Sequence, residues 1–252
     1  MTEFLDLGAP VLAACTVAII AGGLVKGVVG IGLPLVAIPI MANFIPIPKA
    51  IALLILSSFA TSVWQSADGG LFKPSVKRLW PMLIGIAIGV AISVKALATF
   101  DVKLLYLILG VIVTTFASLL HRSLVLPVTP RAERWVAPLA GIVAGLIGGL
   151  SMLFGPIYAM YLSGLKLGKE LFVAGISLFN VWATVVLAIA MAQNDLLGGA
   201  DLMASLLALI PSSLGVLLGT KLRHRINEDM FRKALAVVLF LIGLNLVRRA
   251  IT

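Results

Sequence analysis

Long apolar segments separated by short polar ones dominate this chain. They cover residues 10–44, 49–67, 76–98, 103–120, 135–163, 170–193, 200–220 and 230–248. Six of these segments are about 18–24 residues long, the length at which a helix crosses about 30 Å of hydrocarbon. Each of the six is therefore predicted to be one membrane-spanning helix.

The two longest segments carry helix-breaking residues near their middle. Gly30, Gly32 and Pro34 interrupt the first, and the second contains Gly148, Gly149 and Ser151 followed by Gly155 and Pro156. Glycine and proline interrupt regular helix. Each long segment is predicted to form a hairpin of two shorter helices, either re-entrant or just spanning. The fold class is then an all-α polytopic membrane protein with three transmembrane helices after each hairpin.

Composition supports a bilayer protein. The chain is 61% hydrophobic and 12% charged, whereas a soluble domain is about 45–50% apolar and about 25% charged. Its net charge of +9 does not indicate nucleic-acid binding, because the basic residues lie in short loops, where they set membrane topology.

The charged loops predict an orientation. Most lysines and arginines fall in four loops, which the positive-inside rule places in the cytoplasm. The acidic N-terminus, with Glu3 and Asp6, and the loop of Asp195 and Asp201 are then outside. Because a signal peptide starts with a basic region, we expect the first apolar segment to stay in the mature protein. Arg248 and Arg249 oppose this scheme.

Three blocks of the first half recur in order in the second. Residues match at an offset of 120 (Lys49, Ser57 and Phe59 with Lys169, Ser177 and Phe179), of 130 (Pro81, Gly85 and Gly89 with Pro211, Gly215 and Gly219) and of 118 (Gly27 and Gly30 with Gly145 and Gly148). The charge pattern makes the two hairpins enter from opposite sides. Residues 1–122 and 135–252 are therefore predicted to be inverted-topology repeats, joined by a cytoplasmic linker at 123–134.

Candidate substrate contacts lie at the helix breaks. A half-helix N-terminus in the membrane carries partial positive charge and favours an anion. For Gly30, Gly32, Gly148 and Gly149 we favour this function, and for Gly22, Gly23 and Gly27 close helix packing. Lys26 is the one charge deep in an apolar segment, which costs about 2.5–3.5 kcal/mol on insertion scales. It serves either a ligand anion or a wet vestibule, or it snorkels to an interface.

Polar side chains share one face on two predicted helices. Thr61 follows Ser57 by four residues, and Asn180 follows Ser177 by three. Their donors suit a tetrahedral or pyramidal oxyanion, and the alternative is interhelical hydrogen bonding. The predicted substrate-binding set is Lys26, Gly30, Gly32, Ser57, Thr61, Gly148, Gly149, Ser151, Ser177 and Asn180.

The sequence lacks the motifs of an enzyme or a metal site. Cys15 is the only cysteine, and His121 and His224 stand beside arginines. No nucleophile elbow, Walker motif or metalloprotease motif is present. We expect no enzyme activity, no cofactor and no bound metal. All acidic residues fall near predicted segment ends or in loops, so the sequence also predicts no buried carboxylate for proton relay.

The glycine stretch from Gly22 to Gly32, running into Pro34 and Pro39, resembles the opening motif of the TauE/SafE family. Ala140 to Pro156 resembles the family's second half, and Trp80 to Lys103 fits its helix pair. The resemblance implies export of sulfite, sulfoacetate or related organosulfonates across a bacterial inner membrane.

A negative cell interior favours outward movement of one negative charge by about 2.3 kcal/mol per 100 mV. We therefore expect an electrogenic exporter that works by alternating access. Its two hairpins are expected to meet near the midplane of the membrane. Three other functions stay open: an anion channel, a transporter of another small anion or neutral sulfur compound, and a non-transport scaffold. A homodimer also stays open.

Overall fold

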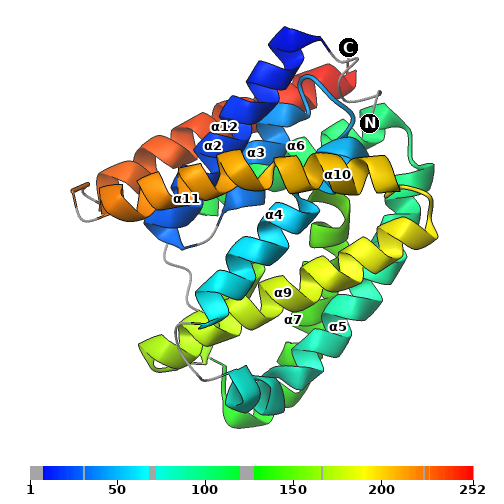
Figure 1. Cartoon of the computed structure of the whole chain (residues 1–252). Helices are drawn as coiled ribbons and strands as arrows, with labels where there is room; N and C mark the ends of the chain where they lie inside the picture. The colour runs from blue at the N-terminus through cyan, green and yellow to red at the C-terminus, as the bar shows by residue number, and fades with distance from the viewer. Residues whose placement is uncertain are drawn as a thin grey trace. The chain divides into compact units, whose positions relative to one another are not determined.

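A computed structural model describes residues 8–30, 32–67, 72–119, 128–165, 167–223, 225–226 and 228–251. Glu3, Asp6, His121, His224 and the linker residues 123–127 lie outside the described residues. The elements in the described parts are all helices. They are α2 (Ala9–Val29), α3 (Leu33–Met41), α4 (Ile47–Ala67), α5 (Phe72–Thr99), α6 (Val102–Leu119), α7 (Pro130–Ser151), α8 (Gly155–Gly164), α9 (Lys169–Gln193), α10 (Gly199–Leu207), α11 (Leu209–Arg223) and α12 (Glu228–Ile251) (Figure 1).

Eight helical segments of the described chain are long and apolar enough to cross a membrane. This confirms the predicted all-α polytopic fold class. The remaining two helices, α3 and α8, have 9 and 10 residues. At about 1.5 Å per residue they are about 14–15 Å long, half the thickness of the hydrocarbon. Their length favours a re-entrant arm over a full crossing.

The first hairpin breaks where the sequence predicts. Gly30 has a left-handed φ of 86° and Gly32 a φ of 122°, values that glycine adopts without steric cost. Helix α3 then folds back along α2. The two helices are in close contact, since a methyl group added at Gly22 would lie only 3.1 Å from the Cβ of Ala37.

The second hairpin breaks inside the predicted cluster of helix-breaking residues, between Ser151 and Gly155. Helix α7 continues through Gly148 and Gly149, and the break falls after Ser151, where Met152 has a φ of 58°. The Ser151 hydroxyl donates to the Ile147 carbonyl at 2.7 Å and accepts from the Leu153 N–H at 3.3 Å. These bonds end the helix at Ser151, and within the predicted cluster Gly148 and Gly149 remain helical.

The segment predicted as one helix over 200–220 is divided at Ala208 into α10 and α11. Pro211 explains the division, since proline has no N–H for the carbonyl of Leu207 four residues earlier and its ring crowds that carbonyl. Together α10 and α11 still form one candidate span, Gly199–Arg223.

The chain forms two compact units, which are described here one at a time. Unit 1 comprises residues 1–57, 99–123 and 196–252, and unit 2 comprises residues 58–98 and 124–195. Each unit therefore combines helices from both sequence halves. The division into repeats at 1–122 and 135–252 stays a prediction.

In unit 1, helices α2 and α11 cross at paired glycines (Figure 1). A methyl group added at Gly23 would lie 3.1 Å from the Cα of Gly215, and one at Gly27 would lie 2.8 Å from the Cα of Gly219. No side chain fits between the two backbones, so these glycines allow the two helices to pack closely, as predicted for Gly23 and Gly27.

Unit 2 contains the same contact between α5 and α7. A methyl group at Gly141 would lie 3.0 Å from the Cα of Gly85, and one at Gly145 would lie 2.8 Å from the Cα of Gly89. These four glycines match those of the α2–α11 contact at the sequence offsets of 118 and 130. An internal repeat would produce this pair of equivalent contacts.

Helices α6 and α12 of unit 1 meet in a reciprocal contact. A methyl group at Gly110 would lie 2.9 Å from the Gly243 carbonyl oxygen and from the Val247 nitrogen. One at Gly243 would lie 3.0 Å from the Gly110 oxygen and from the Thr114 nitrogen. Such reciprocity, in which each element makes the same contact on the other, is typical of a two-fold relation.

We expect Gly27→Ala and Gly145→Ala to destabilise the protein by similar amounts, about 1–3 kcal/mol, because each added methyl group collides with a facing backbone. Thermal unfolding of the purified protein in detergent measures the loss. Gly199→Ala is the control, since no atom lies within 4 Å of a methyl group there. Destabilisation by only one of the two variants would contradict the equivalence of the two contacts.

Candidate functional site

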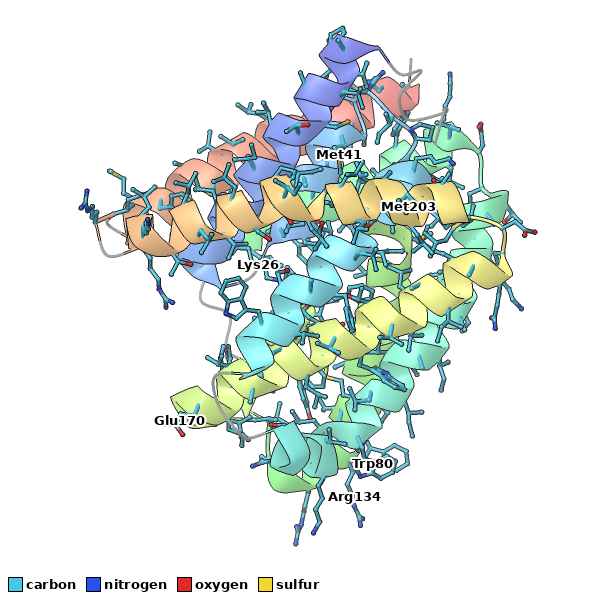
Figure 2. All side chains as sticks on the ribbon, in the orientation of Figure 1. Lys26, Met41, Trp80, Arg134, Glu170 and Met203 are labelled. Atoms are coloured by element: carbon cyan, nitrogen blue, oxygen red, sulfur yellow. The ribbon has the colours of Figure 1, made fainter. Side chains whose placement is uncertain are left out.

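The predicted site residues of unit 1 gather at the first helix break. Lys26 lies in the last turn of α2 and is 4% exposed; Figure 2 shows it near the end of α2 that leads into α3. Gly30 ends α2, and Gly32 precedes α3, whose N-terminus has no side-chain cap. A buried lysine thus lies one turn before the break that leads into a short helix, and both the lysine and the helix N-terminus favour negative charge.

The polar face of α4 spans the boundary between the units. Ser57 belongs to unit 1 and Thr61 to unit 2, and both are buried. The Thr61 hydroxyl donates to the Ser58 carbonyl at 3.3 Å. The structure therefore describes the two predicted residues in different units.

Three predicted residues of unit 2 have packing or capping contacts. The Phe154 ring lies where a side chain at Gly148 would extend, and Gly149 lies against the Ser93 hydroxyl. Ser151 uses its hydroxyl to close the end of α7. These contacts give each residue a structural function, and substrate binding by them stays a prediction.

Unit 2 brings the second helix break together with α9. Ser177 is buried and Asn180 is partly exposed, and Phe179 between them packs against α8. Its ring centroid is 5.0 Å from that of Tyr158 and 6.4 Å from that of Tyr161. The predicted polar turn of α9 and the short arm of the hairpin are therefore neighbours.

Two buried hydroxyls near this region, those of Tyr158 and Tyr161, were missed by the sequence reasoning. No residue in the described ranges hydrogen-bonds the hydroxyl of Tyr158 or Tyr161. The available signal was that two of the chain's three tyrosines lie one helical turn apart, shortly after Pro156.

Asp201 is buried, so the prediction that no carboxylate is buried was wrong. It is 5% exposed, its Oδ1 lies 3.0 Å from the Lys49 Nζ, and its Oδ2 accepts the Gly198 N–H at 2.9 Å. Helix α10 begins at Gly199, so the carboxylate lies in a first turn, where the helix dipole also stabilises it.

Arg249 binds the end of α3, which explains a basic tail on the predicted outer side. Its Nη1 donates to the Asn43 carbonyl at 3.0 Å, and its guanidinium lies 5.5 Å from the Tyr106 ring centroid. Asn245 donates to the Asn43 side chain at 2.8 Å. Because these contacts fix Arg249 to the first hairpin, its position reflects structure as well as topology.

Eight candidate spans and two broken hairpins in the described part of the chain define the class: a polytopic membrane protein. Residues 14–246 match the family of sulfite exporter TauE/SafE, and the chain belongs to that family. No curated protein and no solved structure matches it significantly.

Membership confirms the resemblance seen in the glycine motifs. It also makes the chain a transporter of small anions in a lipid bilayer and not an enzyme. The described residues contain no group of three histidines, cysteines or acids that could hold a metal.

We expect Lys49→Met to destabilise the protein by about 1 kcal/mol, because it removes the ammonium that pairs with the buried Asp201 carboxylate. The effect is small because the Lys49 side chain is 39% exposed, so that water screens the ion pair. Asp201→Asn retains the cap on Gly198. Thermal unfolding of both variants and of the double variant gives the coupling energy. Strict additivity of the two losses would show that the ion pair contributes nothing.

Proposed function

We propose that this protein exports small sulfur-containing anions, such as sulfite, sulfoacetate or related organosulfonates, across the bacterial inner membrane. The observation that carries this proposal is the family match over residues 14–246, which includes both broken hairpins. The N-terminus lies outside and the basic loops lie in the cytoplasm.

Lys26 supports an anion as the substrate. Its side chain is buried, and Lys26 lies in the last turn of α2, just before the break that leads into the uncapped N-terminus of α3. A long-lived positive charge at this depth is costly, and a passing anion would lower that cost. Lys26 with Gly30, Gly32 and Ser57 in unit 1, and Thr61, Gly148, Gly149, Ser151, Ser177 and Asn180 in unit 2, form the proposed substrate contacts.

Alternating access follows from an inverted repeat. The equivalent glycine contacts of α2 with α11 and of α5 with α7 support such a repeat, as does the reciprocal contact of α6 with α12. In the first two of these contacts a hairpin arm, α2 or α7, packs on a helix from the other sequence half. Rigid contacts of this kind would let a hairpin and its partner helix move together.

The membrane potential supplies the driving force. Outward movement of one negative charge gains about 2.3 kcal/mol per 100 mV when the cell interior is negative. The buried Asp201 is paired with Lys49, so the pair has no net charge. Export driven by the membrane potential alone is therefore compatible with the presence of the buried Asp201 carboxylate.

Purified protein in liposomes should carry radiolabelled sulfite in a saturable manner that depends on an imposed potassium–valinomycin potential. Lys26→Ala should abolish this flux, because it removes the buried positive charge, and Lys26→Arg should retain part of it. Lys77→Ala, which removes an exposed lysine of α5, is the control and should transport like wild type.

Three other results would contradict parts of this proposal. Flux without saturation or counterflow would indicate an anion channel. Equal transport by wild type, Lys26→Ala and Lys26→Arg would remove Lys26 from the site. No flux at either polarity from folded protein would exclude sulfite, and sulfonates, thiosulfate and neutral sulfur compounds would then be tested as a panel.

A further inference from the structure

Two buried phenols in α8 have no function in the site considered so far. Tyr158 is 0% exposed and Tyr161 is 5% exposed. Throughout the described part of the chain, no group hydrogen-bonds either hydroxyl. The two residues are three apart in α8, so they lie on one face of that helix.

An unsatisfied buried hydroxyl is costly, at about 1–3 kcal/mol, and in native proteins it calls for an explanation. Other buried hydroxyls of unit 2 solve the problem with backbone carbonyls: Thr184 donates to Asn180 at 2.7 Å and Ser93 to Gly145 at 3.1 Å. A tyrosine hydroxyl stands at the far end of a rigid ring and cannot reach the carbonyls of its own turn. Its partner must come from elsewhere.

Ring contacts hold both phenols beside the second helix break. The Tyr158 ring stacks nearly parallel on Phe154, the residue before α8, with centroids 5.9 Å apart and planes at 11°. Both tyrosine rings also pack on Phe179 of α9. No side chain caps the N-terminus of α8. The two rings are therefore held in place on the helix that begins at this break, and the uncapped N-terminus of that helix also favours an anion.

We propose that Tyr158 and Tyr161 donate hydrogen bonds to an oxygen of the transported anion as it passes through unit 2. This inference rests on the proposed function and adds two substrate contacts to it. Phenols are donors that remain protonated at neutral pH, and bonds from them to an anion are stronger than bonds between neutral groups.

The surroundings indicate a singly charged oxyanion, such as a sulfonate or bisulfite. Glu133 and Arg78 are the charged groups that act on Tyr161, and they pair with each other at 3.5 Å, so they add no net positive charge. The rest of the cluster is aromatic. Stripping water from a doubly charged anion costs far more than from a singly charged one, and neutral hydroxyls cannot offset the difference.

Tyr158→Phe and Tyr161→Phe remove only the hydroxyls. In the liposome assay each should raise the KM for sulfite about ten- to a hundredfold, the loss of one hydrogen bond to a charged group, with little change in Vmax. Tyr106→Phe is the control: it lies in unit 1, keeps its ring beside Arg249, and should leave KM unchanged. Methanesulfonate should compete with sulfite more strongly than sulfate does, and the reverse order would overturn the single-charge assignment.

Thermal unfolding without substrate gives a second readout. Each phenylalanine variant should be at least as stable as wild type, because an unpartnered hydroxyl has been removed. Clear destabilisation would reveal a protein partner and overturn the inference, as would an unchanged KM in both variants. Absence of wild-type flux with every anion of the panel would instead overturn the proposed function, and the inference with it.

Discussion

The backbone must satisfy its own hydrogen bonds inside a bilayer, and the rest of this structure depends on that constraint. Lipid offers no partners for N–H and C=O groups, so spanning segments must be helical. The described chain departs from helix inside its apolar segments at few places, among them Gly30, Gly32 and Met152–Phe154. Residues there, such as Leu33 and Phe154, are buried in protein. Both breaks lie beside polar groups that serve transport in our proposal.

Helix association in lipid cannot rely on the hydrophobic effect. The stabilising energy has to come from van der Waals contact between closely packed helices. Paired glycines do this between α2 and α11, between α5 and α7, and between α6 and α12. The outer faces remain apolar: Ile84, Ile88 and Ile92 of α5 are about half exposed, whereas Met82, Ile86 and Val90 on its other face are fully buried. One helix thus presents one stripe to lipid and another to protein.

Two charged groups of unit 1 have identifiable partners. Asp201 pairs with Lys49, and Arg249 holds the end of α3 through Asn43. These two groups stabilise the first unit. Lys26 differs from them in its position, one turn before a helix break and the uncapped α3. That position links the electrostatics of the fold to the binding of an anion.

The sequence by itself determined the all-helical membrane fold, the presence of two broken hairpins and the family, because apolar length, Gly/Pro interruption and glycine motifs are local properties. Tertiary structure alone decided the pairing of α2 with α11 and of α5 with α7. It also revealed the Lys49–Asp201 pair, whose members are 152 residues apart, and the buried phenols beside Phe179. These features require contacts between distant residues, and no periodicity along a chain specifies which apolar helices will touch.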